Sequence, residues 1–542
     1  MTLICVPLMV TDPALARAQA LVARERGADL VEYRVEGFLG DATEDGGSID
    51  DRIGAVCALA EGSPLACIVT CRSAGEGGEA HVDDDVRLML YERLAGLATP
   101  PRYLDVELAS YERSGEFRRR VDACVGEPGN ARDSRPSLIL SVHDFKGRPN
   151  DLLRRVTRLN ACERAAVHKV AFRARSVRDA LEAMSLCEGS ARPMIAIAMG
   201  DEGQMSRLLA GKAKAFLTYA ACDAGPTAPG QPRVEELLGT YRFRSVQPTT
   251  RVYGIVGWPV SHSRSPAMHN AGFGSIGWDG VYVPLPVAAG ADEASSFASF
   301  KGALVELMAH HPLRFRGCSV TIPHKENLFR LASAQGWGLD EASTACGAAN
   351  TLVIEDGGAV RVLNTDALAM EALLAGQGGM VEGAQALILG AGGMARAVAW
   401  ACARAGLATG IYARDAAQAR RVAALIGEHV PGARVESGRL DEVPARAFRF
   451  IVNCTPLGMT GGPDPKATPM SVAQLAVCAE RAMVMDTVYA PQRTPFLAAA
   501  EEAGVRERIG GLTLLVEQAR QQFEAWTHQQ APREVFERGA RA

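Results

Sequence analysis

Eight strand–helix repeats in the first 245 residues and a glycine-rich turn near residue 390 predict an α/β protein in two parts. Eight such units in about 245 residues are typical of a TIM (β/α)8 barrel. The glycine-rich turn stands between a strand-like and a helix-like segment, as in a Rossmann-like domain. We therefore expect an N-terminal barrel followed by a two-domain α/β portion that contains a Rossmann-like domain.

The eight apolar runs of the first half have the length and composition of buried parallel strands. Between them, apolar residues recur with helical spacing, as in 12–26, 83–96, 151–161 and 176–188. The expected strands are 4–9, 30–35, 65–72, 103–108, 138–145, 167–172, 194–199 and 215–221.

Charged and polar residues interrupt the strands near their C-terminal ends, where the active site of a TIM barrel lies. An unpaired buried charge is costly, so these side chains are expected to satisfy one another and a ligand in one barrel mouth. They are Glu32, Arg34, Arg72, Asp105, Glu107, His143 and Lys169.

Lys169 and His143 come from neighbouring expected strands and suit Schiff-base chemistry. A neutral lysine amine attacks a ketone to form an iminium, and burial with a nearby cation such as Arg72 would favour the neutral amine. Histidine titrates near neutral pH, so it can remove a proton and then help a β-hydroxyl leave. Taken alone, a strand lysine or histidine is more often structural, and His168 competes with His143 as the base.

The loops of the first half carry three further motifs: Cys-Arg-Ser-Ala-Gly-Glu-Gly-Gly-Glu at 71–79, Ala-Met-Gly-Asp-Glu-Gly-Gln-Met-Ser-Arg at 198–207 and Thr-Ala-Pro-Gly-Gln at 227–231. With these motifs in order, essentially all of 1–245 resembles the type I 3-dehydroquinate dehydratases, which need no metal or cofactor.

This resemblance implies that Lys169 is the Schiff-base lysine, that His143 transfers protons and that Glu76 orients His143. It also implies that Arg207 holds the substrate carboxylate. Thr227 stands where the family has a serine; it retains a hydroxyl, so we expect a change of lid fit more than a loss of activity. The substrate-binding residues implied are Glu32, Arg34, Arg72, Arg207, Thr227 and Gln231, with Asp105 and Glu107 as network residues that are as much structural as catalytic.

Composition excludes several function classes. Of 542 residues, 48% are hydrophobic and 22% charged, as expected of a well-packed protein, and the length suggests about three domains. A net charge of -4 argues against a nucleic-acid or anionic-membrane surface. Thirteen scattered cysteines predict a reducing compartment. The N-terminus begins directly as a strand and no apolar run reaches membrane-spanning length, so we expect a soluble, cytoplasmic protein.

A short polar segment, 241–251, joins the two halves and is too short for a long flexible tether. We predict three domains: a barrel at 1–245, a substrate-binding domain at 252–366 completed by 516–542, and a Rossmann domain at 367–515.

The clearest motif of the second half is Ala-Leu-Ile-Leu-Gly-Ala-Gly-Gly-Met-Ala-Arg-Ala at 386–397. Its Gly390, Gly392 and Ala395 form a Gly-x-Gly-x-x-Ala turn that lets backbone amides approach a pyrophosphate. The next strand ends at Arg414 and Asp415. Arg414 would meet the 2′-phosphate of NADP and Asp415 the free 2′-hydroxyl of NAD, although both residues could simply face solvent. We favour NADP.

Further motifs extend over nearly all of 252–530, which resembles shikimate dehydrogenase. They lie at 254–266 (Gly-Ile-Val-Gly-Trp-Pro-Val-Ser-His-Ser-Arg-Ser-Pro), 319–326 (Ser-Val-Thr-Ile-Pro-His-Lys-Glu), 348–352, 364–366, 453–459, 486–491 and 510–518.

This second resemblance implies that Lys325 and Asp366 form the catalytic pair beside the substrate ketone. Helix capping before Pro266 is the structural alternative for Ser263 and Ser265. The substrate-binding residues implied are Ser263, Ser265, Thr321, Asn350, Tyr489 and Gln518. The cofactor-binding residues implied are Gly390, Ala391, Gly392, Gly393, Ala395, Arg414, Thr455, Met459 and Gly511.

The second half also departs from the family at several positions. Ser319 replaces a common asparagine and Ala367 a common glycine, and Ala413-Arg414-Asp415 stands where Asn-Arg-Thr is usual. The stretch 304–316 is longer than usual, and we expect an enlarged loop before a strand that carries Lys325.

Together the two halves predict a bifunctional enzyme that dehydrates 3-dehydroquinate and then reduces 3-dehydroshikimate to shikimate with NADPH, in aromatic amino-acid biosynthesis. The expected partners are these small molecules, with no nucleic acid or membrane. One alternative is a catabolic enzyme that uses NAD and acts on quinate. Another is a metabolite-sensing pseudoenzyme, against which the presence of Lys169, His143, Lys325 and Asp366 argues.

Overall fold

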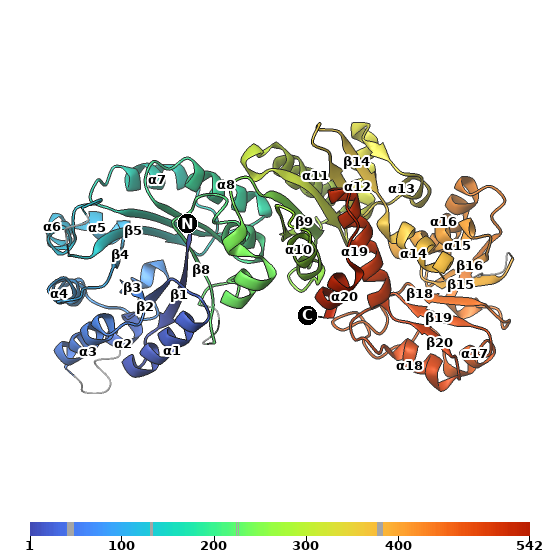
Figure 1. Cartoon of the computed structure of the whole chain (residues 1–542), viewed down its shortest axis with the longest axis horizontal. Helices are drawn as coiled ribbons and strands as arrows, with labels where there is room; N and C mark the ends of the chain where they lie inside the picture. The colour runs from blue at the N-terminus through green and yellow to red at the C-terminus, as the bar shows by residue number, and fades with distance from the viewer. Residues whose placement is uncertain (41–47, 131–133, 224, 226, 377–382, 542) are drawn as a thin grey trace. The chain divides into compact units, whose positions relative to one another are not determined.

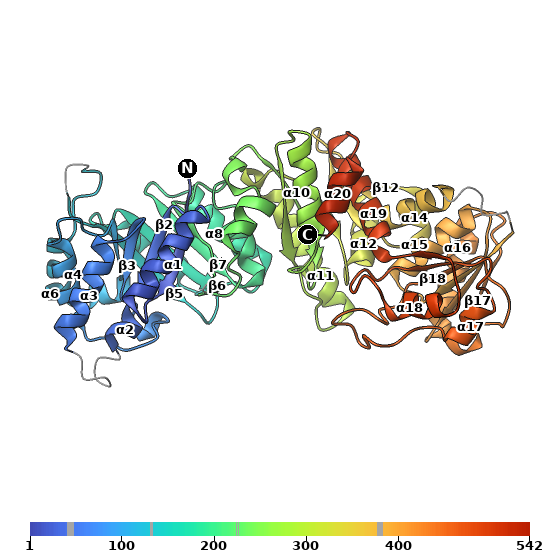
Figure 2. The same ribbon diagram turned by 60° about the horizontal axis from the view of Figure 1, so that its bottom comes forward.

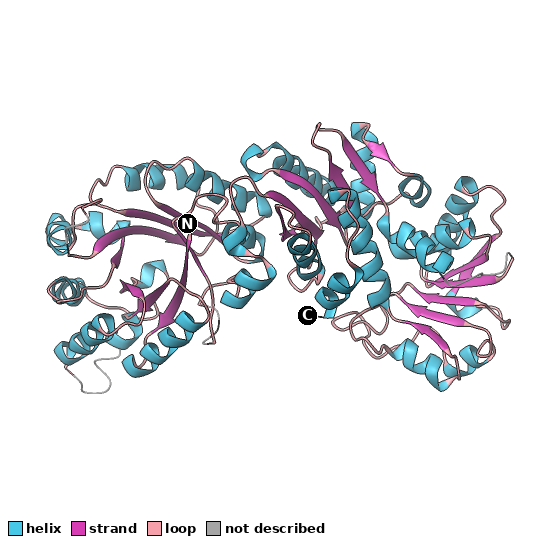
Figure 3. Cartoon of the chain, in the orientation of Figure 1, coloured by secondary structure: helices cyan, strands magenta, loops and turns pink. Residues whose placement is uncertain are grey.

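The computed structural model describes residues 1–40, 48–130, 134–223, 225, 227–376 and 383–541. Figures 1 and 3 show strands enclosed by helices in each half of the chain. The chain divides into two compact units: 1–251 with 283–287 and 303–314, and the other residues of 252–542. None of the described helices is both long and apolar enough to cross a membrane.

The first half is a parallel barrel, as predicted. Its strands follow the order β7-β6-β5-β4-β3-β2-β1-β8, and neighbouring strands in this order are parallel. The first and last strands in this order, β7 and β8, meet where the amide of Phe216 donates to the carbonyl of Met194 at 2.8 Å. The strands are β1 Leu3–Met9, β2 Leu30–Arg34, β3 Ala66–Thr70, β4 Tyr103–Glu107, β5 Ser137–Asp144, β6 Val167–Arg173, β7 Met194–Met199 and β8 Leu217–Tyr219.

Helices cover the outside of the barrel, and alternate residues of the strands fill its centre. The inner cluster includes Cys5, Ile68, Ile139 and Ile195. The eighth unit ends in a short π-helical segment, Glu236–Thr240. The helices are α1 Pro13–Glu25, α2 Glu36–Gly40, α3 Ile49–Glu61, α4 Asp84–Ala95, α5 Leu108–Arg113, α6 Gly115–Cys124, α7 Leu152–Asn160, α8 Val177–Glu188 and α9 Gln204–Leu208.

The segment after the barrel is fastened to it. The buried ammonium of Lys212 donates to the carbonyl oxygens of Pro248 and Thr250 at 2.8 and 2.7 Å. These bonds restrain 246–250, in agreement with the prediction that the join is no flexible tether.

A mixed sheet opens the second half, in the order β10-β9-β11-β13-β14-β12. Strands β9 and β11 are parallel, whereas β13 is antiparallel to both β11 and β14. Its strands are β9 Arg251–Gly257, β10 Gly280–Pro286, β11 Phe315–Val320, β12 Gly338–Leu339, β13 Thr351–Ile354 and β14 Val360–Leu363.

The expectation of an enlarged loop at 304–316 is wrong. Helix α11, Glu293–Ala309, occupies its first part, a 3-10 turn at His311–Leu313 follows, and β11 then begins at Phe315. Lys325 also does not lie on a strand; it is the first residue of helix α12, Lys325–Gln335. The strand–turn–helix arrangement places the lysine at the carboxyl end of β11.

The helices near the C-terminus pack against this sheet. Helices α19, Gly511–Thr527, and α20, Arg533–Arg541, lie beside α10, Ser265–Ser275 (Figures 1 and 2). Their apolar faces form one core in which His269, Tyr282 and Trp526 pack ring against ring. Residues far apart in sequence therefore build one layer.

The third sheet has the strand order β17-β16-β15-β18-β19-β20, and its neighbouring strands are parallel, as in a doubly wound fold. Two buried clusters pack against it. Its strands are β15 Gln385–Leu389, β16 Ala408–Ala413, β17 Val435–Arg439, β18 Phe450–Asn453, β19 Met483–Asp486 and β20 Glu507–Ile509. The other helices of this half are α13 Glu341–Cys346, α14 Thr365–Gly376, α15 Gly393–Arg404, α16 Ala416–His429, α17 Val472–Ala476 and α18 Pro495–Glu502.

Candidate active sites

Lys169 lies in the barrel mouth, buried between acids. Its ammonium donates to Oδ2 of Asp105 at 2.8 Å and lies 3.6 Å from Oε1 of Glu32. Arg72 donates to the same oxygen of Asp105 at 2.9 Å. Arg72 is the cation that the sequence predicts beside Lys169, and the carboxylate of Asp105 lies between the two. Burial opposes the ionisation of Asp105, but Arg72 and then Lys169 outweigh it and hold the pKa of this carboxyl well below its usual range.

Arg72 is held by a network that extends around the mouth. It donates to Ser141 at 2.8 Å and to Glu107 at 3.2 Å, and Glu107 is also paired with Arg87. Ser141 and Arg87 were not anticipated, although Ser141 precedes His143 by two residues and so shares its side of β5. Every charge of this cluster has a counter-ion, which is what makes its burial tolerable.

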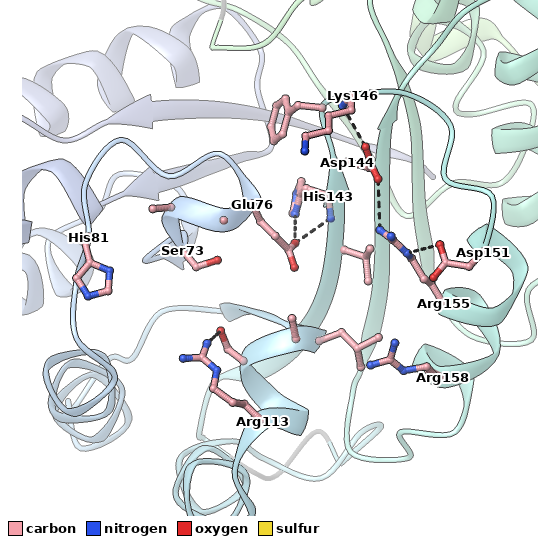
Figure 4. Close-up of a pocket in the computed structure, with 17 residues that line it drawn as sticks. Ser73, Glu76, His81, Arg113, His143, Asp144, Lys146, Asp151, Arg155 and Arg158 are labelled. Carbon is pink, nitrogen blue, oxygen red and sulfur yellow. Dashed lines mark hydrogen bonds and ion pairs between the residues drawn. The ribbon is translucent and has the colours of Figure 1, made fainter.

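His143 and Glu76 form a closely coupled pair (Figure 4). One oxygen of Glu76 accepts from the backbone amide of His143 at 2.8 Å and lies 3.1 Å from its Nδ1. Burial raises the pKa of Glu76 to about 7. Burial, followed by the charges of Arg72 and Lys169, lowers the pKa of His143 well below its usual range. A neutral His143 that donates from Nδ1 to Glu76 presents Nε2 as a base.

The mouth pocket brings together the residues predicted to bind substrate. His143 and Lys169 line it, whereas Glu76 lines a cavity of about 700 Å³ that His143 also borders (Figure 4). His168 alternates with Lys169 along β6, so its side chain faces away from the mouth. The predicted residues on the pocket wall are Glu32, Arg34, Arg72, Arg207, Thr227 and Gln231.

Arg207 differs from the other cations of the mouth. It is 2% exposed, burial lowers its pKa to about 10, and it has no ion-pair partner among the described residues. Gln231 is positioned by Thr227, whose amide and hydroxyl donate to its Oε1 at 2.9 and 3.3 Å. A serine would make the same bonds, so the Thr227 departure preserves the contact.

A second lysine–acid pair stands in the other half of the chain. The ammonium of Lys325 donates to Oδ2 of Asp366 at 2.5 Å, from the first turns of α12 and α14. Lys325 and Gly393, the first residue of α15, line one cavity of about 470 Å³. The pair therefore faces the start of the glycine-rich helix.

The other predicted substrate residues lie on the elements around this pair. Oδ1 of Asn350 accepts from the amide and hydroxyl of Thr365, next to Asp366. The hydroxyl of Ser263 accepts from the amide of Ser265 at 3.2 Å in a turn just before α10, whose N-cap is Arg264 and has no side-chain cap. In the described part of the chain, no hydrogen bond or ion pair joins Thr321, Tyr489 or Gln518 to Lys325 or Asp366.

The glycine-rich turn between β15 and α15 leaves room for a phosphate. Gly390 has a φ of 117°, and a Cβ there would approach the carbonyl of Cys454 to 3.0 Å. Nothing lies within 4 Å of a Cβ built on Gly392, the N-cap of α15, which has no side-chain cap. Unpaired amides at a helix N-terminus favour anions, so these residues fit a dinucleotide pyrophosphate.

The remaining predicted cofactor residues follow the strands of this sheet. Oδ1 of Asn453 accepts from the amide and hydroxyl of Thr455 and so fixes the loop after β18. Gly511 begins α19, where a Cβ would approach the carbonyl of Thr487 to 2.5 Å. Ala395 is buried in α15, whereas Met459 is exposed.

Arg414 and Asp415 have different surroundings at the end of β16. Oδ1 of Asp415 accepts from the amides of Ala417 and Gln418 at 2.8 and 3.3 Å and caps α16. Arg414 is exposed, with no hydrogen bond or ion pair in the described chain. Asp415 thus has a structural role that Ser or Thr would also fill.

Both halves of the chain are similar to known proteins. The family profile for type I 3-dehydroquinase matches residues 4–248, that for the shikimate dehydrogenase substrate binding domain 255–352, and that for the shikimate 5′-dehydrogenase C-terminal domain 511–538. Shikimate dehydrogenase (NADP(+)) of Anaeromyxobacter dehalogenans is 39% identical over 52% of this chain and 93% of its own. The solved dehydroquinate dehydratase and shikimate dehydrogenase structure from S. pombe covers 99% of this chain and 98% of its own, with 23% identity and a TM-score of 0.43.

One relative matches almost the whole chain. The chloroplastic bifunctional 3-dehydroquinate dehydratase/shikimate dehydrogenase of Arabidopsis thaliana is 31% identical over 99% of this chain and 83% of its own length. Both halves and their order are the same, and the chain therefore belongs to the bifunctional 3-dehydroquinate dehydratase/shikimate dehydrogenase family.

Proposed function

We propose that Lys169 and Lys325 are the centres of two consecutive reactions: dehydration of 3-dehydroquinate to 3-dehydroshikimate, and reduction of that product to shikimate. The observation that carries this proposal is that each lysine is bound to one carboxylate in a separate cavity. The expected catalytic roles of Lys169, His143, Glu76, Lys325 and Asp366 are part of the proposal.

In the barrel, Lys169 loses a proton and its amine attacks the substrate ketone; water leaves and an iminium forms. The iminium acidifies the adjacent carbon, and Nε2 of His143 removes its proton. The same proton then goes to the β-hydroxyl, which departs as water. Hydrolysis of the iminium releases 3-dehydroshikimate and the free lysine.

Substrate contacts follow from the charges of the mouth. Arg207 is the one buried cation there without a counter-ion among the described residues, so it would bind the substrate carboxylate. Glu32, Arg34 and Arg72 would hold the hydroxyls and the ketone end. Gln231, positioned by Thr227, would close over the substrate.

In the second half, bound NADPH would supply a hydride to the ketone. The amides at the start of α15 would hold its pyrophosphate, and exposed Arg414 its 2′-phosphate. The ammonium of Lys325 stabilises the oxygen that gains negative charge and supplies its proton, while Asp366 orients that ammonium. Around the ring, Ser263, Ser265, Thr321, Asn350, Tyr489 and Gln518 would bind the carboxylate and hydroxyls.

The NAD-dependent, quinate-using alternative depended mainly on Asp415. Because Asp415 caps α16, its presence no longer favours NAD over NADP. The biosynthetic direction and NADP are therefore the better-supported proposal. Its location is proposed as the cytoplasm, since thirteen scattered cysteines suit a reducing compartment.

A coupled assay tests the proposal. Purified protein is given 3-dehydroquinate with NADPH or NADH, nucleotide oxidation is followed and the product is identified. Shikimate formed with a preference for NADPH is the expected result. A preference for NADH would support the quinate alternative. Accumulation of 3-dehydroshikimate without nucleotide oxidation would contradict the assignment of Lys325.

A further inference from the structure

Tyr219, at the end of β8, is a polar residue of the barrel mouth to which the proposed chemistry assigns no role. It is 5% exposed and lines the same pocket as Lys169, Arg207 and Gln231. Its hydroxyl is buried and has no hydrogen-bond partner among the described residues. A buried hydroxyl without a partner is costly, so a group that binds in the pocket is the natural acceptor.

The ring of Tyr219 is firmly placed. The ammonium of Lys169 lies 4.7 Å from the ring centroid, and Tyr219 pairs with Cys5 of β1 in the barrel register. The ring therefore supports Lys169 from the pocket wall, and the hydroxyl is buried without a partner among the described residues. Substitution by Phe would keep the ring contact and remove only the oxygen.

Two other unpartnered donors line this pocket. Nε of Arg207 and Nε2 of Gln231 are buried without an acceptor, and the Oε1 of Gln231 is already taken by Thr227. Tyr219 and Arg207 are close enough for the phenol to influence the pKa of the guanidinium. Three residues that line one pocket, from β8, α9 and the loop at 227–231, thus each carry a donor without an acceptor in the described part of the chain.

The acceptor that best fits three donors is a carboxylate. Arg72 and Lys169 already share Asp105, and Arg34 is paired with Glu36, so Arg207 alone among these cations awaits an anion. The carboxylate is the one anionic group of the proposed substrate. A charged acceptor also strengthens the bond from a neutral hydroxyl.

We propose that the hydroxyl of Tyr219 donates to the substrate carboxylate and completes, with Arg207 and Gln231, the clamp that sets substrate affinity in the dehydratase half. This inference rests on the proposed function of that half. Tyr219 is a binding and positioning residue: it holds a remote group of the substrate, equally in the ground and transition states.

The test is steady-state dehydration by the full-length chain carrying Tyr219→Phe. KM for 3-dehydroquinate should rise about 10-fold or more, the loss expected for one hydrogen bond to a charged group. The kcat should stay within about twofold of the unmodified value, because the lost bond binds the substrate equally in the ground state and the transition state. Tyr33→Phe is the matched control: it removes a hydroxyl that bonds Ser63 at 3.0 Å, from the opposite side of β2 to Glu32, and should leave KM unchanged.

Two further measurements identify the group that Tyr219 contacts. The first measures how tightly two inhibitors bind the dehydratase site. A cyclohexane polyol that carries a carboxylate should inhibit Tyr219→Phe more weakly than the unmodified chain, whereas the same polyol without the carboxylate should inhibit both equally. In an Arg207→Ala background, Tyr219→Phe should raise KM by less than it does alone. Borohydride reduces the lysine–substrate iminium to a stable adduct that mass spectrometry detects. At saturating substrate, Tyr219→Phe should form as much of this adduct as the unmodified chain, which would show that its site is intact.

The outcomes separate the two proposals. If the unmodified chain fails to dehydrate 3-dehydroquinate, the proposed function of the first half is wrong. If that chain is active and Tyr219→Phe has the same KM, only the proposed role of Tyr219 is wrong. A lower kcat with unchanged KM would place the hydroxyl at the reacting carbons and overturn its assignment to the carboxylate.

Discussion

At the scale of single residues, we expect the proposed pair Glu76 and His143 to set the pH range of dehydration. Burial raises the pKa of Glu76 to about 7 and keeps His143 neutral well below neutral pH. Above pH 7 the Glu76 carboxylate accepts from Nδ1 of His143 and leaves Nε2 free; below it Glu76 is protonated. The dehydratase kcat/KM should therefore rise with pH through an apparent pKa of about 7, measured on the free enzyme.

The variant Glu76→Gln separates this ionisation from others. It cannot ionise, so the rise near pH 7 should disappear, and kcat should fall about 10- to 100-fold because His143 is less well oriented. A profile for Glu76→Gln that keeps the same rise would assign the ionisation to another group.

We expect Arg414 to determine the choice between NADPH and NADH. Arg414→Ala should raise KM for NADPH about 10-fold or more, because one contact between a guanidinium and the 2′-phosphate is lost, and should change KM for NADH little. Asp415→Ser is the control: it keeps the cap of α16 and should leave the preference intact. A shift towards NADPH in Asp415→Ser would mean that Asp415 faces the ribose as well as the helix.

At the scale of elements, the barrel strands were predictable because each is a short apolar run bounded by polar residues. The helical part of 304–316 was missed because a family comparison shows extra length and not conformation, whereas α11 simply continues to Ala309. The motif that contains Lys325 begins at Ser319 within β11, and the sequence therefore predicts a strand at the lysine. The turn after β11 ends the strand and starts α12 at the lysine itself.

The turn before α15 depends on glycine at one position. Gly390→Ala should lower stability by about 1–3 kcal/mol, because its φ is 117° and the carbonyl of Cys454 would lie 3.0 Å from the new Cβ. It should also weaken NADPH binding by moving the turn. Gly427→Ala, within α16 with nothing within 4 Å of its Cβ, should instead gain about 0.5–1 kcal/mol. Thermal unfolding and NADPH titration of both variants check this, and equal effects would contradict it.

At the scale of the whole molecule, topology made much of the site predictable. Parallel strands present their carboxyl ends at one edge, so Lys169, His143 and Arg72 were expected to meet. The sequence does not say which acid each cation contacts. That Asp105 is shared by Arg72 and Lys169, and that Tyr219 and Arg207 lack partners, depends on side-chain geometry across several strands.

The two proposed sites are built on different sheets, so each should survive loss of the other. Lys169→Ala should lower dehydration by roughly 10³-fold or more, because the nucleophile is absent, and should leave shikimate oxidation with NADP unchanged. Lys325→Ala should do the reverse while nucleotide binding, measured by titration, stays near normal.

An equimolar mixture of the two variants then tests whether the halves work independently. Lys325→Ala still forms 3-dehydroshikimate, and Lys169→Ala still reduces it, so the mixture should convert 3-dehydroquinate and NADPH to shikimate. Each half has its own lysine–acid pair, at 2.8 and 2.5 Å, and neither pair includes a residue of the other half. A mixture that accumulates 3-dehydroshikimate would show that the second site accepts the intermediate only from its own chain, and independence of the halves would be wrong.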